Sequence, residues 1–142
     1  MLNPATEPPA KQYLTILLVE DEPIPMLIHQ LMLADLGYKK VDTAKNGQQA
    51  LCLSANQYDL ILMDIGLPDL NGFEVTSNIR QKEYSNKQAY IVGLTAYSLE
   101  EIKNKCLMTG MDEVISKPIT AVQLRQLLDK VNLIALTRDN SL

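Results

Sequence analysis

The feature that most constrains the fold is an alternation of short apolar runs with helix-like segments, repeated five times from Leu14 onward. Three of the runs are almost continuously apolar, which is typical of parallel strands that are buried on both faces. Regular strand–helix alternation predicts an α/β fold, a doubly wound parallel sheet with helices on both faces. We expect the five strands at residues 15–19, 40–44, 60–63, 90–94 and 113–116.

The segments between these runs have helical patterns with recognisable ends. We expect the first helix to follow Pro23 and to stop at Gly37, a residue suited to a helix C-terminus. Its apolar positions are Ile24, Leu27, Ile28 and Leu31, whereas His29 is interpreted as a solvated residue beside that stripe.

Two of the remaining helices open with a capping-box spacing, which marks a helix N-terminus. Ser98 and Glu101 open the fourth helix, which ends near Gly110; Thr120 and Gln123 open the fifth. The second and third helices are expected at about 47–57 and 72–82. The fifth helix continues as an apolar stripe of Leu124, Leu127, Leu128, Val131 and Ile134.

The length of 142 residues suits a single domain, which we place at 14–136. Residues 1–13 hold three prolines and are expected to form a linker or a disordered segment, and residues 137–142 a frayed tail. The formal net charge of −4 argues against a nucleic-acid partner. No apolar stretch could span a bilayer and no signal-peptide pattern is present, so we expect a cytoplasmic location without direct membrane contact.

Residues with complementary chemistry follow four of the five expected strands. Glu20, Asp21 and Glu22 follow the first strand, and Asp64 follows the third. The fourth strand leads into Thr95, and the fifth leads into Lys117. Because the carboxyl ends of parallel strands meet at one edge of the sheet, these side chains should share a pocket.

Carboxylates that are brought together repel each other, and a hard divalent cation with oxygen ligands relieves that repulsion. Mg²⁺ fits, because it is held by one or two carboxylates and keeps other positions for water and phosphate oxygens. A carboxylate beside Mg²⁺ can attack phosphorus and form an aspartyl phosphate. The Lys117 ammonium and the Thr95 hydroxyl could then stabilise the charge of the transferred group.

Each residue also has an ordinary structural interpretation. Asp21 or Glu22 could cap the following helix, Asp64 could be a turn residue, and Lys117 could be a solvated surface charge. Taken singly, the residues favour these interpretations. The combination of four chemically complementary strand ends favours a functional site.

The stretches ILLVEDE (16–22), LILMDIGLPDLNG (60–72), GLTA (93–96) and GMDEVISKP (110–118) resemble the receiver domains of two-component signalling. The resemblance covers nearly all of the chain from Leu14 to about Val131. It implies a flavodoxin-like (CheY-like) fold with five strands in the order 2-1-3-4-5.

The resemblance also implies a role for each matching residue. Asp64 would be the phosphoacceptor, Asp21 a direct metal ligand and Glu20 an acid that holds the metal through water. The backbone carbonyl of Gly66 would be a further metal ligand. Thr95 would be the switch hydroxyl and Lys117 the partner of the phosphoryl group, with a cis bond between Lys117 and Pro118.

One position departs from the common pattern of the family. Many receivers carry an aromatic residue three positions before the lysine, where this chain has Val114. We therefore consider Tyr97 as a substitute that takes part in switching or shields the phosphate. The resemblance places the partner surface on the fourth helix, the fourth and fifth strands, and the fifth helix.

The residues of the motifs DIGLPD and GMDEVISKP resemble those in the C-terminal receiver of a hybrid sensor histidine kinase. A stand-alone single-domain regulator is the alternative. The expected partners are a histidine kinase domain and a histidine phosphotransfer protein, and the expected state is a monomer or weak dimer. Such a domain catalyses only its own phosphorylation and dephosphorylation. Two other classes stay open: a Mg²⁺-dependent aspartyl-phosphate phosphatase, although Gly66 stands where its acid is expected, and a pseudo-receiver without phosphoryl chemistry.

Overall fold

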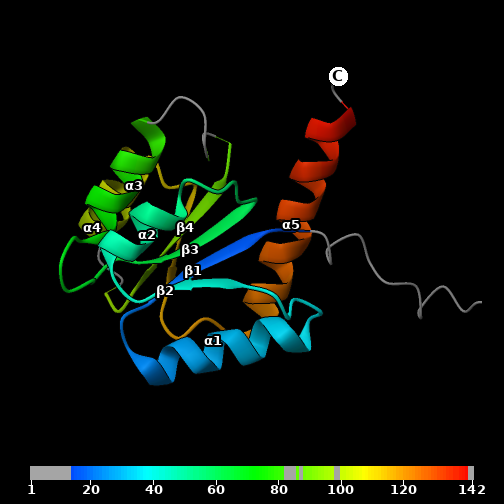
Figure 1. Cartoon of the computed structure of the whole chain (residues 1–142), viewed down its shortest axis with the longest axis horizontal. Helices are drawn as coiled ribbons and strands as arrows, with labels where there is room; N and C mark the ends of the chain where they lie inside the picture. Colours follow the sequence, from blue (N-terminus) through cyan, green and yellow to red (C-terminus); the bar gives the residue numbers. More distant parts are fainter. Residues whose placement is uncertain (1–13, 82–85, 87, 98–99, 141–142) are drawn as a thin grey trace, which may run out of the picture.

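The computed structural model describes residues 14–81, 86, 88–97 and 100–140, and the predicted linker at 1–13 lies outside them. The predicted sheet is confirmed: five parallel strands lie in the order β2-β1-β3-β4-β5 (Figure 1). The strands are β1 (Ile16–Val19), β2 (Asp42–Ala44), β3 (Leu60–Asp64), β4 (Tyr90–Thr95) and β5 (Glu113–Ser116). The helices are α1 (Pro23–Asp35), α2 (Gly47–Leu53), α3 (Gly72–Gln81), α4 (Glu100–Met108) and α5 (Ala121–Asn140).

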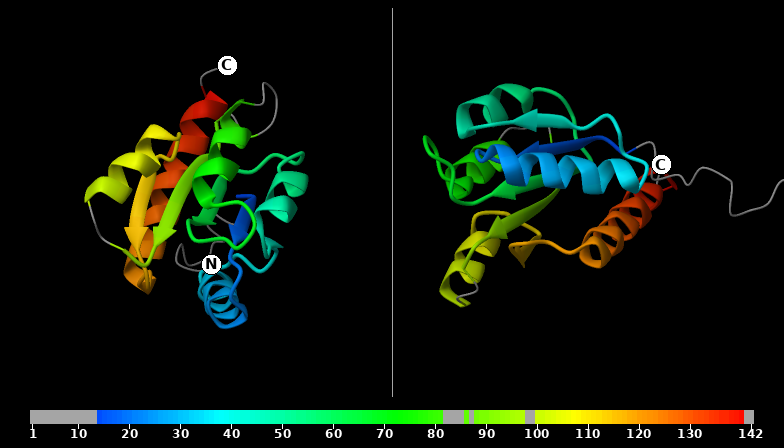
Figure 2. Two further views of the ribbon diagram at one scale, coloured as in Figure 1. Left: turned by 90° about the vertical axis from the view of Figure 1, so that its left-hand side faces the viewer. Right: turned by 90° about the horizontal axis from the view of Figure 1, so that it is seen from below.

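The sheet separates two hydrophobic layers, because alternate residues of a strand point to opposite faces. Helices α1 and α5 pack on one face, against side chains such as Leu18 and Leu62. Helices α2, α3 and α4 pack on the other face, against side chains such as Val19 and Met63 (Figures 1 and 2). The nearly continuous apolar runs of β1 and β3 are fully buried, as expected for the centre of such a sheet.

The pairing of the strands positions the site residues. Asp64, the last residue of β3, lies beside Leu94 of β4, and Thr95 lies beside Ser116 of β5. The backbone N–H of Glu20 donates to the carbonyl of Ala44 at the end of β2. The four strand ends therefore meet at one edge, as predicted from parallel pairing.

Helix α5 begins as the sequence predicts. The Thr120 N–H donates to the Gln123 side chain at 2.9 Å, and the Gln123 N–H donates to the Thr120 hydroxyl at 3.1 Å, which is a complete capping box. The predicted stripe is buried from Leu124 to Val131 and partly buried at Ile134. The helix continues through Asn140, whereas we expected ordered structure to end after residue 136.

Helix α1 does not pack against the sheet through the apolar stripe that begins at Ile24. The four apolar positions from Ile24 to Leu31 are exposed, and the helix instead packs through Met26, His29 and Leu33. Both sets of residues are spaced by three or four positions, so both lie along a helix face. The periodicity alone could not choose between them.

His29 is consequently buried rather than solvated. Burial lowers the pKa of its imidazole, and the nearby positive charge of Lys117 lowers it further. The side chain is therefore neutral at pH 7 and belongs to the packing between α1 and the sheet.

The other differences concern element ends. The strands β1 and β2 begin one and two residues later than expected. Helix α2 ends at Leu53 instead of near residue 57. The hydroxyl of Ser54, the residue after the helix, donates a hydrogen bond to the carbonyl of Leu51 at 2.6 Å. The predicted Ser98 cap of α4 lies outside the described residues. Within the described parts of the chain, no helix has both the length and the apolar character required to cross a bilayer.

Candidate functional site

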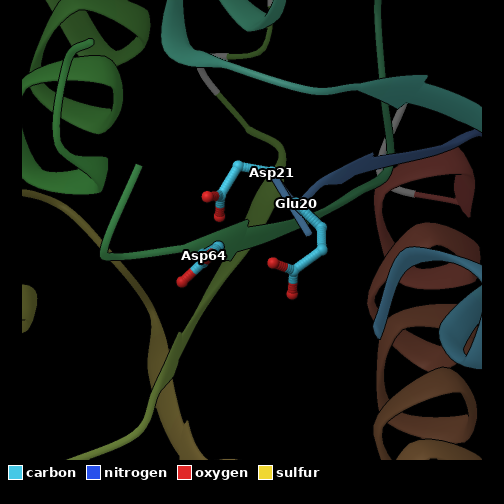
Figure 3. Close-up of side chains that lie close together, drawn as sticks. All are labelled: Glu20, Asp21 and Asp64. Carbon is cyan, nitrogen blue, oxygen red and sulfur yellow. The ribbon is translucent and has the colours of Figure 1, made fainter. Parts of the chain in front are cut away.

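Three carboxylates converge at the carboxyl edge of the sheet. Glu20 and Asp21 follow β1, and Asp64 ends β3. One oxygen atom of each lies within 4.8 Å of the others, and Figure 3 shows the three side chains close together. Glu20 and Asp64 are buried, whereas Asp21 is partly exposed. The sequence-based prediction that these carboxylates come together at one edge of the sheet is confirmed.

Lys117 is the cation that faces this cluster. Its Nζ lies 3.0 Å from Oε1 of Glu20 and 3.2 Å from Oδ1 of Asp64. The backbone holds the lysine in place, because its N–H donates to the carbonyl of Thr95 at 2.7 Å. The Lys117–Pro118 peptide bond is cis, as the resemblance implied. One ammonium thus neutralises only part of the charge of three carboxylates.

The pKa values reflect this shortage of positive charge. Burial, together with the hydrogen bond to Asp64, raises the pKa of Glu20 to about 7. Lys117 lowers this pKa, but by less than burial and Asp64 raise it. Burial also raises the pKa of Asp21. Burial would raise the pKa of Asp64 as well, but hydrogen bonding from Glu20 and the Lys117 charge lower it overall. Glu20 is therefore only about half ionised near pH 7, whereas Asp64 is ionised.

The turn after β3 orients Asp64. The N–H of Gly66 donates to Oδ1 of Asp64 at 3.1 Å. A side chain at Gly66 would meet open space, so the role predicted for its backbone carbonyl does not depend on glycine. Gly72 is different, because a Cβ there would lie 2.7 Å from the carbonyl oxygen of Asp64. Glycine at the start of α3 lets that helix approach the end of β3.

A cleft of about 320 Å³ opens beside Asp64. Its polar wall includes Thr95 and Lys117, and its apolar wall includes Phe73 and Ile102. The sequence pattern did not point to Phe73 or Ile102, because single apolar residues on two separate helices carry no motif. The complete lining consists of Glu22, Asp64, Ile65, Gly66, Phe73, Thr95, Ala96, Tyr97, Ile102 and Lys117.

Thr95 lies at the end of β4 with its hydroxyl oxygen accepting a hydrogen bond from the Tyr97 N–H at 3.0 Å. The Tyr97 side chain is exposed at the rim of the cleft. Val114, which stands where many receivers have an aromatic residue, is partly buried on β5 and paired with Gly93. Thr95 thus lines the cleft, and the neighbouring strand carries valine instead of an aromatic residue at position 114.

The donor set suits a hard divalent cation. Carboxylate oxygens are the ligands that Mg²⁺ prefers, and the cluster has more negative charge than Lys117 balances. Glu22, at the N-cap position of α1, makes no side-chain capping bond. The acidic sequence after β1 is therefore not explained by helix capping at Glu22.

The chain matches the family model of the response regulator receiver domain over residues 16–129. It therefore belongs to the receiver domains of two-component systems. This membership agrees with the observed strand order, and it leaves the phosphatase alternative without support.

Relatives include both large kinases and small regulators. The chain is 40% identical over 114 residues to the sensor histidine kinase RcsC of Salmonella typhi, covering 80% of this chain and 12% of that protein. It is 35% identical over 125 residues to the two-component response regulator 24 of Arabidopsis thaliana, covering 87% of each. The matched region is only 6% of the length of a hybrid kinase relative and 12% of the length of the sensor kinase RcsC.

A similar solved structure is the receiver domain of a sensor histidine kinase from Pseudomonas aeruginosa PAO1. The two share 36% of residues with a TM-score of 0.76, over 84% of this chain and 97% of that one. That structure has a magnesium ion coordinated in its active-site cleft.

Proposed function

We propose that Asp64 accepts a phosphoryl group from a phosphohistidine and that the receiver passes the signal on through this modification. The observation that carries the proposal is the convergence of an ionised, buried Asp64 with two further carboxylates and Lys117, beside a cleft that Asp64 and Lys117 line. A carboxylate kept ionised by its surroundings is a competent nucleophile.

The reaction would proceed by in-line displacement at phosphorus. An Oδ atom of Asp64 forms a new bond to phosphorus while the phosphorus–nitrogen bond of the donor breaks. The bonding electron pair goes to the imidazole nitrogen, which takes up a proton. Lys117 lies 3.2 Å from Asp64 and stabilises the phosphoryl oxygens, together with the Thr95 hydroxyl.

Mg²⁺ would be held by Asp21, Asp64 and the carbonyl of Gly66, with Glu20 acting through a water molecule. When bound, the ion supplies positive charge to the phosphoryl oxygens during transfer. Loss of the Glu20 proton is a condition for binding the ion, because carboxylates bind a metal in the ionised form.

The partners that fit this chemistry are a histidine kinase domain, in the same chain or another, and a histidine phosphotransfer protein. We assign the chain to the receiver of a hybrid histidine kinase in the cytoplasm, monomeric or weakly dimeric. The hybrid origin is supported by three relatives from Dictyostelium discoideum that are named hybrid signal transduction histidine kinases. The Arabidopsis regulator, of which the match covers 87%, supports a stand-alone receiver as the second candidate.

Intact mass after incubation with Mg²⁺ and acetyl phosphate tests the proposal. The expected result is one added phosphate that hydroxylamine removes and that an Asp64→Asn variant does not acquire. No adduct on the wild-type chain, together with no binding of beryllofluoride, would instead identify a pseudo-receiver.

A further inference from the structure

The loop between β3 and α3, residues 65–71, contains Gly66, whose carbonyl is a proposed metal ligand. Backbone hydrogen bonds hold the two ends of this loop. The N–H of Ile65 donates to the carbonyl of Leu94 at 3.1 Å, and the N–H of Gly72 donates to the carbonyl of Ile65 at 2.9 Å. Between these ends, the loop is attached to a different part of the molecule, the start of α2.

Asp69 makes this attachment. Its Oδ1 atom accepts a hydrogen bond from the N–H of Gly47 at 2.8 Å, and its Oδ2 atom accepts one from the N–H of Gln48 at 3.0 Å. Both N–H groups belong to the first turn of α2, where a helix offers no backbone partner of its own. The bond from Gly47 is the main cause of the lowered pKa of Asp69, so the carboxylate is ionised at neutral pH. The helix dipole also favours a negative charge at this position.

Helix α2 and the loop are fitted to each other. The first turn of α2 has no acidic residue of its own, so Asp69 supplies the negative charge from a segment about 20 residues away. Packing supports the contact, because a Cβ at Gly47 would lie only 2.7 Å from the Cβ of Leu70, the residue after Asp69. Helix α2 therefore sets the position of the middle of the loop.

We infer that Asp69 is a positioning residue for the metal site, because it ties the loop to α2 and so holds the carbonyl of Gly66 in place for the ion. Gly66 is exposed, and a side chain there would meet open space, so its position depends on the rest of the loop. A ligand that is fixed in advance spares the ion the entropy cost of ordering the loop. Both carboxylate oxygens of Asp69 are engaged by α2, so Asp69 acts through the loop. The inference rests on the proposed function of Asp64 and its metal site.

The test separates positioning of the loop from simple stabilisation of α2. Asp69→Ala removes both the attachment and the charge. Asp69→Ala combined with Gln48→Glu returns an acid to the first turn of α2, at an exposed position, and restores the net charge, but it does not restore the attachment. The matched control is Asp59→Ala at the opposite edge of the sheet, where the carboxylate accepts from the N–H and the hydroxyl of Thr15 at 2.9 and 3.1 Å.

The measurement is the dissociation constant of Mg²⁺ for the unphosphorylated chain, from NMR chemical shifts, at about pH 8 so that Glu20 is ionised. About 0.3 M KCl screens long-range attraction between exposed charges and the ion. We expect Asp69→Ala to raise the constant about tenfold, as for other residues that hold metal ligands in place. The double variant should recover stability toward urea but keep the weakened Mg²⁺ binding, and Asp59→Ala should bind Mg²⁺ as the wild type does.

Three outcomes would overturn the inference while the proposed function stands. These are a dissociation constant within twofold of wild type in Asp69→Ala, full recovery of Mg²⁺ binding in the double variant, and an equal loss in the Asp59→Ala control. If Asp69→Ala does not fold, Asp69→Asn, whose amide keeps one acceptor oxygen, gives the same comparison with a smaller expected rise. A wild-type chain that takes up phosphate but binds no Mg²⁺ would overturn this inference, whereas failure to take up phosphate would count against the proposed function as well.

Discussion

The two edges of the sheet differ in how their polar side chains are paired: they have matching partners at the amino edge and an excess of negative charge at the carboxyl edge. At the amino edge, Asn86 donates to the carbonyls of Ser54 and Asn56 at 2.8 Å and accepts from the Tyr58 N–H at 2.6 Å. Its side chain thereby joins the loop before β3 to the loop before β4. Each donor and acceptor of that side chain group has a partner, as is usual for buried polar groups.

Arg80 and Asp112 complete the amino edge. The Arg80 guanidinium donates to Asp112 at 2.8 Å and to the carbonyl of Gly110 at 2.9 Å. Asp112 also accepts from the Ile91 N–H at 2.9 Å. The opposite charges of Arg80 and Asp112 are thus matched one to one.

The carboxyl edge has three carboxylates and one lysine, and the raised pKa of Glu20 is the result. Unbalanced charge lowers the stability of the unliganded fold, and it provides affinity for a cation and reactivity toward phosphorus. The amino edge therefore holds the loops together, whereas the carboxyl edge is suited to binding a cation and reacting with phosphorus. Substitutions at the two edges should therefore separate stability from function.

The largest effect should follow Lys117→Met. The substitution removes the ammonium that lies 3.2 Å from Asp64, so it removes charge stabilisation during transfer. We expect phosphoryl uptake from acetyl phosphate to fall by about 10²-fold or more. The measurement is the initial rate of mass increase; a rate within threefold of wild type would show that Lys117 is only a structural counter-ion.

Asn86→Ala at the opposite edge should cost about 2–4 kcal/mol of unfolding free energy, because it leaves buried backbone groups without their partner. The residue also has a φ of 56°, which alanine tolerates poorly. Urea unfolding measures the loss. Phosphoryl uptake by the molecules that stay folded should be unchanged, and slower uptake would refute the division between the two edges.

Titration of Glu20 should make the stability of the metal-free chain depend on pH. Glu20 keeps its proton up to about pH 7 in the folded state, but only to its ordinary value of 4.5 when unfolded. The folded state thus binds more protons between these values, so its stability falls as the pH rises through them, by about 1–3 kcal/mol. The raised pKa of Asp21 acts in the same direction.

The lowered pKa of Asp64 acts only in more acidic solution, where stability is lost as the pH falls below its ordinary value of 3.8. Between pH 4.5 and 7 the buried His29 contributes with the opposite sign, because its lowered pKa makes stability rise as the pH rises toward its ordinary value of 6.5. A Glu20→Gln variant keeps this contribution, so the difference in slope between wild type and variant measures the effect of Glu20. An equal slope in wild type and variant would exclude Glu20 as its source.

Mg²⁺ should have the smallest of these effects. At ten times its dissociation constant, the ion should stabilise the folded state by about 1.4 kcal/mol. The stabilisation should weaken as the pH falls below about 7, because protonated Glu20 no longer attracts the ion. Thermal unfolding with and without Mg²⁺ measures it, and Asp64→Asn should reduce it; stabilisation that is independent of pH would contradict a site at this cluster.

Most of the fold was predictable from the sequence because its signals are local. A run such as LILM before Asp64 is typical of a strand buried on both faces, and five strand-like runs separated by helices leave few alternative topologies. The capping box of Thr120 and Gln123 fixes its own helix start through two hydrogen bonds. The shared pocket of Glu20, Asp21, Asp64 and Lys117 then follows from parallel pairing alone.

The tertiary structure decided what no local pattern could. Helix α1 has apolar residues on two faces, and only packing against the sheet buried Met26, His29 and Leu33 and left the stripe that starts at Ile24 exposed. The proton on Glu20 and the apolar wall formed by Phe73 likewise depend on neighbours that lie far away in the sequence. The sequence by itself determined which residues meet at the edge of the sheet, because strand pairing is dictated by buried apolar runs. Burial and pKa were decided only by the assembled neighbours, because both depend on distances that the chain acquires when it folds.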